Sequence, residues 1–329
     1  MYLEFIVTFI VSLFLIYVVK YYAPKLGLID IPNDRSSHVS HTPSGAGIGF
    51  FMAVFCVFPL FHFDIVTDNI WTFIAIFVVF LIGVLDDHHD ASPNTKFIVL
   101  IVATLLLSLD DVIIFFGTHI FLGWFAIPFT VFALVGFTNA LNLIDGLDGL
   151  AATVSLVILG TFFAVGVMHN DIFMMTLSLS FIATLCAFLV FNWHPASIFM
   201  GDSGSLILGF VISVLAVKSL AYLPTVSILF IAAVPLFDTL IVMIRRKLNG
   251  RSAFAADRCH FHHILRHFFA EDTKKTVLFL GVLQLVYSIT GLQLDKNMDE
   301  GYLMVLFILN IVLIYIFLGA MIKRQKREC

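Results

Sequence analysis

The chain has 329 residues, of which 60% are apolar and only 12% are charged, and its mean hydropathy is +1.05. This composition excludes both a soluble globular domain and a disordered chain. With a formal net charge of −4, nucleic acid is not an expected partner. The four cysteines show no CxxC spacing, so the sequence predicts neither a disulfide framework nor a thiolate metal site.

Apolar segments close to the roughly 20 residues that cross a bilayer recur along the whole chain. Because lipid offers the backbone no hydrogen-bond partners, such segments span it as helices. We therefore predict an all-α, polytopic integral membrane protein, a single membrane domain over 1–329, with about 11 transmembrane helices or alternatively 10. The segments are 3–19, 45–61, 70–85, 97–109, 124–143, 150–168, 173–191, 204–217, 226–244, 276–292 and 302–322. Residues 112–121 form a candidate re-entrant hairpin or interfacial strand, and the first segment is expected to remain as an uncleaved anchor.

The basic residues predict the orientation, since Lys and Arg near span ends stay cytoplasmic. With the N-terminus outside, sixteen of the 18 basic residues fall on the cytoplasmic side, and only Lys218 and Lys296 fall on the other. The C-terminus is then cytoplasmic. So are the loops at about 20–45, 86–96, 144–149, 192–203 and 245–275, which carry the polar clusters of the chain. Polar groups that gather on one face of a bilayer indicate an active site there.

Aspartates mark the predicted cytoplasmic span ends, because a carboxylate at the bilayer centre costs about 2.5 to 3.5 kcal/mol. Solvated helix caps are the alternative interpretation for any one of them. Caps explain the whole set poorly, because the segment NALNLIDGLD repeats a polar residue every third position along one helix face and its exit. Such oxygen ligands suit Mg²⁺, which leaves positions for water and substrate phosphate. The residues in question are Asp86, Asp87, Asp90, Asn139, Asn142, Asp145, Asp148 and Asp202.

Two glycine-rich motifs, 145–149 (DGLDG) and 201–204 (GDSG), each place a carboxylate at a tight turn before a predicted helix. The N–H groups that begin each helix are expected to face an anionic phosphate. Ordinary helix punctuation is the alternative interpretation of either motif.

Three histidines, His260, His262 and His263, lie beside Arg258 in the most basic loop. Zinc is one interpretation, although Cys259 is the only nearby thiol. Donation from imidazole and guanidinium groups to phosphate oxygens is favoured, because Arg offers a planar fork and His is a donor near neutral pH. Binding of anionic lipid headgroups by a basic loop is the third alternative.

The motifs LDD, NALNLIDGLDGL, FMGDSGS and DRCHFHH, in this order, resemble those of the bacterial polyprenyl-phosphate N-acetylhexosamine-1-phosphate transferases, of glycosyltransferase 4 type. The resemblance extends from Lys25 to about Lys275, and its histidine loop is similar to the branch that uses UDP-N-acetyl sugars. It implies that the phosphate of undecaprenyl phosphate attacks the β-phosphorus of a UDP-N-acetylhexosamine and releases UMP. It also implies Mg²⁺ as cofactor, with Mn²⁺ as a substitute, and a place in the bacterial cytoplasmic (inner) membrane at the start of a surface polysaccharide such as an O-antigen.

The same resemblance assigns roles to single residues. It implies metal binding by Asn142 and Asp202. It places Asp145 and Asp148 near nucleotide and sugar, and it makes Asp86 a candidate base and Asp87 an orienting or metal-assisting group, so that Asp86, Asp87, Asp145 and Asp148 form the predicted catalytic set. Substrate binding is implied for Lys96, Asn139, Arg258, His260, His262 and His263.

Two other functions stay as alternatives. A CDP-alcohol phosphotransferase also joins lipid and phosphate, but Gly149 is followed by LAAT rather than by the Ala-Arg of that class. An ion-coupled transporter would place its ionisable groups near the midplane of two repeated halves, which this chain lacks. N-acetylglucosamine is the expected sugar, and N-acetylgalactosamine and a 6-deoxy amino sugar stay as alternatives. The oligomeric state is left open, with a homodimer as one alternative.

Overall fold

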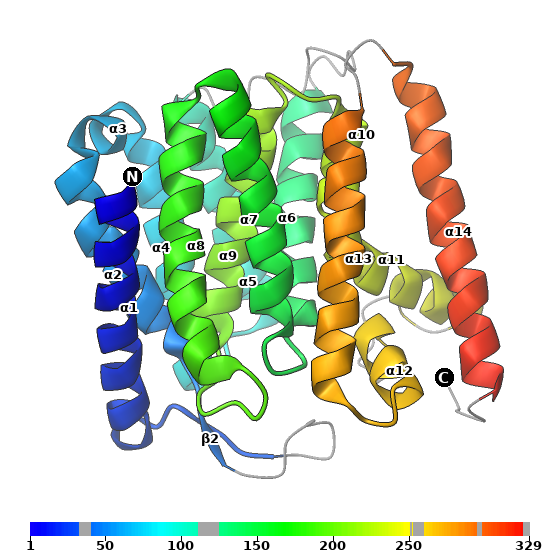
Figure 1. The fold of residues 1–329 in the computed structure, drawn as a ribbon, viewed down its shortest axis with the longest axis horizontal. Coiled ribbons are helices and arrows are strands. Elements are labelled where there is room, and N and C mark those ends of the chain that lie inside the picture. The colour runs from blue at the N-terminus through cyan, green and yellow to red at the C-terminus, as the bar shows by residue number, and fades with distance from the viewer. Residues whose placement is uncertain (33–40, 111–124, 251, 253–259, 295–297, 325–329) are drawn as a thin grey trace.

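The computed structural model describes residues 1–32, 41–110, 125–250, 252, 260–294 and 298–324 (Figure 1). The described chain is almost entirely helical. Its elements are α1 (Tyr2–Tyr22), η1 (Ala23–Leu26), β1 (Ile29–Asp30), β2 (Thr42–Pro43), α2 (Ala46–Phe61), α3 (Phe63–Asp68), α4 (Ile70–His89), α5 (Pro93–Leu106), η2 (Leu107–Asp110), α6 (Ala126–Ile144), α7 (Leu150–His169), α8 (Ile172–Asn192), α9 (Asp202–Ser219), α10 (Thr225–Ile231), α11 (Ala233–Leu248), α12 (Phe261–Phe268), α13 (Thr273–Gln293) and α14 (Glu300–Arg324).

The all-α, polytopic membrane class is confirmed. Among the described residues, nine helices are long and apolar enough to cross a bilayer, and the bent pair α10 and α11 makes a tenth if it counts as one span. The second predicted span corresponds to α2, an apolar helix of only 16 residues. A total of eleven therefore stays a prediction. The predicted hairpin or strand at 112–121 lies outside the described residues.

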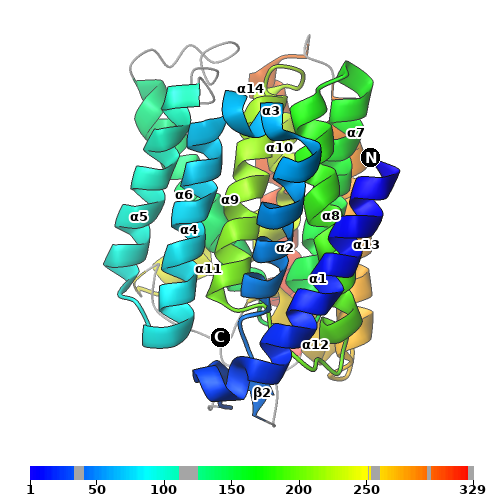
Figure 2. The same ribbon diagram turned by 90° about the vertical axis from the view of Figure 1, so that its left-hand side faces the viewer.

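Helix α9 occupies the centre of the bundle and packs against α2, α4, α6 and α7 (Figures 1 and 2). In its apolar window 83% of the residues are buried, whereas the corresponding value for the peripheral helix α14 is 17%. A helix that is apolar on all sides belongs in such a central position. The start of α9 is thereby held among several other elements, and this start carries the GDSG motif.

Glycines allow α2 and α4 to approach the start of α9 at backbone distance. A Cβ atom on Gly47 of α2 would lie 2.1 Å from the backbone nitrogen of Gly204, and one on Gly83 of α4 would lie 2.5 Å from the Cα atom of Ser203. Both distances are far below van der Waals contact. The missing side chains thus let three helices converge where the site lies.

The predicted continuous span 226–244 is wrong, because the chain breaks at Ala232 and α11 turns by 86° from α10. Pro235 lies in the first turn of α11, where its missing N–H group costs no helical hydrogen bond. Gln284 of α13 satisfies two backbone groups that the break exposes. Its side-chain nitrogen donates to Ile231 O at 2.7 Å, and its Oε1 accepts from Val234 N at 3.0 Å. A buried amide therefore compensates the break.

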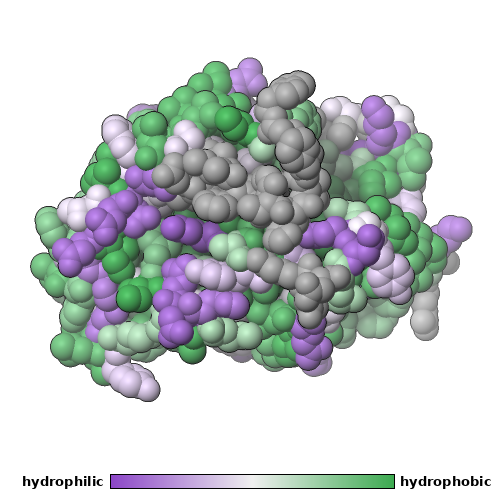
Figure 3. Space-filling model, turned by 90° about the horizontal axis from the view of Figure 1, so that it is seen from above, coloured by the Kyte–Doolittle hydropathy of each residue, from purple (hydrophilic) through white to green (hydrophobic). Residues whose placement is uncertain are grey.

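Helix α1 begins at one end of the bundle, near α3, and α14 ends beside α12 at the opposite end, which also holds β2 (Figure 1). The latter end also holds the turns after α4 and α6 and the start of α9, so the predicted gathering of the polar clusters at one end is confirmed for the described residues. On the opposite end, hydrophilic residues lie among hydrophobic ones that continue around much of the outline (Figure 3). Which end faces the cytoplasm stays a prediction.

Candidate active site

A cavity of about 310 Å³ opens at the end of the bundle where the motifs meet. The loop after α6, the loop before α9, the β1–β2 segment and α12 contribute to its wall. Its carboxylate and amide lining residues are Asp30, Asp87, Asn142, Asp145, Asp148, Asn192 and Asp202, and His263 also lines it. Residues more than a hundred positions apart in the sequence thus form one acidic pocket.

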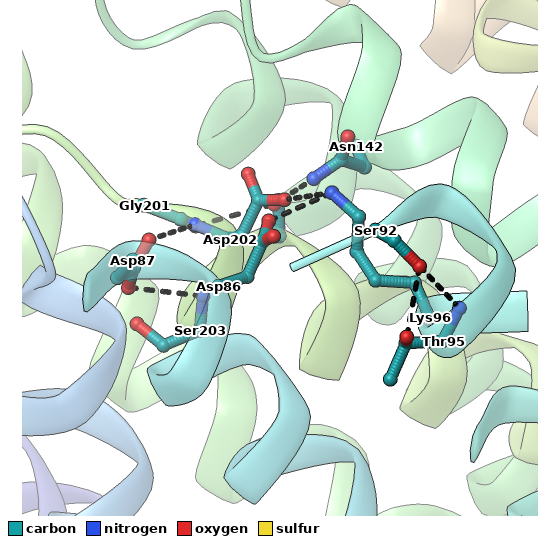
Figure 4. A network of polar contacts seen from close by, with 10 residues as sticks. Asp86, Asp87, Ser92, Thr95, Lys96, Asn142, Gly201, Asp202 and Ser203 are labelled. Atoms are coloured by element: carbon teal, nitrogen blue, oxygen red, sulfur yellow. Dashed lines mark hydrogen bonds and ion pairs between the residues drawn. The ribbon is translucent and has the colours of Figure 1, made fainter. Parts of the chain in front are cut away.

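Lys96 bridges two of the predicted aspartates (Figure 4). Its Nζ donates to Asp86 Oδ2 at 2.7 Å and to Asp202 Oδ2 at 3.2 Å. Ser92 caps α5 by accepting from Thr95 N at 3.2 Å, which fixes the first turn that carries Lys96. The ammonium group compensates the buried Asp86 carboxylate. The predicted contact of Lys96 with substrate and the predicted base role of Asp86 stay predictions.

Asp87 binds the backbone at the start of α9 (Figure 4). Its Oδ1 accepts from Asp202 N at 2.7 Å and its Oδ2 accepts from Ser203 N at 3.2 Å. The expectation that these N–H groups face a phosphate is therefore wrong, because Asp87 occupies them. Gly201, with φ +74°, is needed at this turn, since a Cβ atom there would lie 2.7 Å from both Asp87 oxygens. The geometry favours an orienting role for Asp87.

The polar stripe runs along the last turns of α6 and into the loop after it, and three of its four residues line the cavity. Asn142, in the last turn of α6, donates from Nδ2 to Ser205 Oγ of α9 at 2.9 Å. Asp145 follows the last residue of the helix and Asp148 lies in the next turn. Asn139 lies one turn earlier, is half-buried, and does not line the cavity. Its predicted contact with substrate stays a prediction.

The oxygen donors of the cavity fit a divalent cation. Burial, with the charges of Asp202 and Asp148, raises the pKa of the Asp145 carboxyl well above its usual range. The negative charges around Asp145 oppose its ionisation, and a bound cation would offset them and favour the ionised form. Hard oxygen ligands from carboxylates and amides are those that Mg²⁺ prefers.

Sequence reasoning missed two residues that hold the loops of the cavity. His194 Nδ1 lies 2.6 Å from Asp148 Oδ2, which also accepts from Ala196 N at 3.0 Å. Asn192 accepts from Gly149 N at 2.8 Å and donates from Nδ2 to Ile198 O at 2.9 Å. These contacts tie the loop after α6 to the loop before α9. The polar run that follows the span 173–191 is the signal by which the sequence could have identified them.

The three predicted histidines fall into two groups. His263 lines the cavity, whereas His260 and His262 lie behind its wall and contact Asp238 of α11. Sequence reasoning missed Asp238, although an ionisable residue inside an apolar segment is itself a sign of a functional position. Arg258 lies outside the described residues, so its predicted role stays a prediction.

His263 is expected to be neutral in the free protein. Burial, together with the neighbouring His262, lowers the pKa of His263 to about 3. A lowered pKa of a base means that the neutral form prevails above that pH, so His263 does not titrate between about pH 6 and pH 9. Replacing it by Asn, which keeps a neutral donor and acceptor, should leave the shape of the kcat/KM profile over this range unchanged, because that profile reports groups of the free enzyme. A lost or displaced inflection in His263→Asn would contradict this.

Residues 69–220 match the family described as Glycosyl transferase family 4. The chain is 36% identical to the probable undecaprenyl-phosphate N-acetylglucosaminyl 1-phosphate transferase of Bacillus subtilis (strain 168), over 93% of this chain and 89% of the relative. It is 30% identical to the undecaprenyl-phosphate alpha-N-acetylglucosaminyl 1-phosphate transferase of Yersinia pestis, over 98% and 92%. The chain is also 41% identical to the phospho-N-acetylmuramoyl-pentapeptide-transferase of Thermoanaerobacter sp. (strain X514), but over only 45% of this chain and 47% of the relative.

Proposed function

This chain belongs to glycosyl transferase family 4, and on that premise we propose that it transfers N-acetylglucosamine 1-phosphate from UDP-N-acetylglucosamine to undecaprenyl phosphate. The observation that carries the proposal is the convergence of the aspartate, asparagine and histidine motifs on one cavity, in a chain that is similar to such transferases along nearly its whole length. The muramoyl-pentapeptide branch is less favoured, because that similarity covers less than half of the chain. A transporter and a CDP-alcohol phosphotransferase are both disfavoured by the family membership.

The reaction is a phosphoryl transfer in which positioning and charge neutralisation do most of the work. A phosphate oxygen of undecaprenyl phosphate bonds to the β-phosphorus of the nucleotide sugar. The bond between that phosphorus and the bridging oxygen breaks, and UMP leaves with the electron pair. The second pKa of a phosphate monoester is near 6, so the attacking oxygen is already largely unprotonated at neutral pH. A strong general base is therefore not required, which agrees with Asp86 being paired to Lys96.

Asp202 and Asn142 are the residues that we propose to hold Mg²⁺, with Asp145 beside them. When bound, the cation neutralises the diphosphate of the donor and the charge that develops during transfer. Asp87 keeps Asp202 in place through the backbone at the start of α9. We further propose that His263, which lines the cavity, donates to a phosphate oxygen of the donor. Mn²⁺ is expected to substitute, because it accepts the same oxygen ligands.

The location of the cavity fits an enzyme that joins a membrane lipid to a soluble nucleotide. The cavity lies at the end of the bundle that carries most of the basic residues in the described part of the chain, and such residues stay cytoplasmic. We propose the bacterial inner membrane as its location, with the cavity facing the cytoplasm, the N-terminus in the periplasm and α2 as an additional span. The start of a surface polysaccharide is the corresponding role, and a homodimer stays a prediction.

The test is UMP release by the purified protein from UDP-N-acetylglucosamine and Mg²⁺, with and without undecaprenyl phosphate. We expect UMP only when the lipid is present, because the lipid phosphate is the nucleophile. UDP-N-acetylgalactosamine and UDP-N-acetylmuramoyl-pentapeptide serve as alternative donors.

Release from another donor alone would correct the sugar and keep the reaction. UMP formed equally without lipid would indicate hydrolysis, and no UMP from any donor would reject the transferase. Discrimination between sugars that differ at one hydroxyl depends on the hydrogen bonds of the pocket, so the donor series also reports on its specificity.

A further inference from the structure

Asp238 of α11 is a buried carboxylate outside the cavity, with only 1% of its surface exposed. It lies between two imidazoles. His260 Nδ1 is 2.6 Å from its Oδ2, and His262 Nδ1 is 3.0 Å from its Oδ1, which also receives the backbone N–H of His262 at 3.3 Å. An isolated buried carboxylate would be costly, so these partners explain how the charge is retained there.

The contacts of Asp238 determine which nitrogen of each ring carries hydrogen. An ionised carboxylate only accepts hydrogen bonds, so both Nδ1 atoms must be donors. Each Nε2 atom is then directed away from Asp238, as an acceptor in the neutral ring or as a donor in the cation. A carboxylate behind an imidazole fixes both its tautomer and its orientation in this way.

His262, whose ring orientation is fixed by Asp238, packs against the wall of the cavity. Its ring is buried, and its Nε2 has no hydrogen-bond partner among the described residues. A Cβ atom on Gly146 would lie 2.7 Å from that Nε2, so the ring lies directly against the loop after α6. On its other side, the centroid of the His262 ring is 4.3 Å from that of His263, which lines the cavity. Asp238, His262 and the wall are therefore in continuous contact.

The break between α10 and α11 places Asp238 where it can reach the histidines. Helix α11 turns away from the direction of α10 at Ala232 and packs against α6, α12 and α13. Asp238 lies in the second turn of α11, after the position that Gln284 stabilises. A straight continuation of α10 would carry Asp238 in a different direction. The contacts of Asp238 with the two histidines therefore depend on the bend.

We infer that Asp238 is a positioning residue for the proposed transfer. It holds His260 and His262 as Nδ1–H tautomers, and it thereby fixes His262 and the neighbouring His263 against the loop that carries Asp145. This inference rests on the proposed function only for its kinetic consequence. Asp238 touches neither the cavity nor, on this assignment, the substrate. A metal ion bound by the same three side chains is the competing interpretation, since their ligand atoms lie within 4.8 Å of one another. The two short contacts favour hydrogen bonds, because each Nδ1 is already matched to one oxygen.

The spectroscopic test is Asp238→Asn in protein labelled with ¹⁵N-histidine, with His260→Gln and His262→Gln to assign the two rings. An asparagine offers one acceptor and one donor in place of two acceptors. We therefore expect one ring to keep its hydrogen on Nδ1 and the other to move it to Nε2. Asp171→Asn is the matched control, because both oxygens of Asp171 likewise accept hydrogen bonds, from Met174 N and the Tyr222 hydroxyl, but Asp171 caps α8 far from the cavity.

The kinetic test combines Asp238→Asn with His262→Gln. We expect each single variant to lower kcat/KM about 10- to 100-fold, as losses of outer-shell partners do. The double variant should be no worse than the poorer single one, because both changes act through the same contact. Asp238→Glu, which keeps a carboxylate, should retain more activity than Asp238→Asn. Thermal unfolding of every variant separates misfolding from mispositioning.

Several results would overturn the inference. Unchanged histidine tautomers in Asp238→Asn, losses that multiply in the double variant, or a bound transition metal that Asp238→Asn removes would each do so. An inactive wild-type protein would reject the proposed function instead. The histidine spectra would then still test whether Asp238 fixes the tautomers of His260 and His262.

Discussion

Asp202→Asn is expected to lower lipid-dependent UMP release by about a thousandfold, because several kcal/mol of charge stabilisation in the transition state come from the proposed cation. The amide keeps the shape of the side chain but removes the charge that Lys96 contacts and that the proposed Mg²⁺ would bind. Rates measured across a Mg²⁺ titration check this. The wild-type protein should lose activity in EDTA and recover it with Mg²⁺ or Mn²⁺, whereas the variant should stay inactive at saturating metal.

Asp90→Asn is the control for this change. Asp90 belongs to the same aspartate segment, but it is exposed and ends α4 with φ 47°, a conformation that asparagine adopts readily. We expect wild-type activity from it. Comparable losses in both variants would indicate that negative charge near the cavity matters in general, and a fully active Asp202→Asn would reject the proposed metal site.

Gly47→Ala is expected to lower both stability and activity, because its methyl group would lie 2.1 Å from the nitrogen of Gly204. The obstructing atoms belong to the backbone and cannot rotate away, so α2 and α9 must separate. Overpacking of this kind costs about 1 to 3 kcal/mol, and sometimes more. The same displacement moves the start of α9, which carries Asp202 and the N–H groups bound by Asp87. Thermal unfolding and UMP release measure the two effects.

Gly160→Ala in α7 provides the matched control, since a Cβ atom there meets nothing within 4 Å. The same substitution at an open helical position is expected to be neutral or to stabilise the protein by about 0.5 to 1 kcal/mol. Equal destabilisation by both changes would mean that glycine matters for chain flexibility, and an unaffected Gly47→Ala would contradict the close approach of the helices.

The membrane class, the approximate ends of most helices and the common end of the polar motifs were predictable from the sequence alone. Each depends on local properties, because a run of about 20 apolar residues spans a bilayer as a helix whatever its neighbours are. The motif residues are polar, and so they mark the ends of such runs. Five of the predicted aspartates and asparagines accordingly line one cavity, namely Asp87, Asn142, Asp145, Asp148 and Asp202.

The partners of these residues were decided by the tertiary structure. Asp87 binds backbone N–H groups that lie 115 and 116 positions further along the chain, and Lys96 joins Asp86 to Asp202. No local pattern specifies such pairs, because they depend on how closely the glycines of α2 and α4 let those helices approach α9.

The break before α11 shows the same limit. Hydropathy predicted a continuous helix at 226–244, since an apolar run looks the same whether it is straight or bent. Only the folded chain brings Gln284 to the exposed backbone groups at the break, and only the bend brings Asp238 to His260 and His262. The sequence by itself thus determined the class of protein, the helices and the chemistry available at one end of the bundle. The contacts that orient these polar side chains join distant parts of the chain, so they were decided only by the packing of the helices.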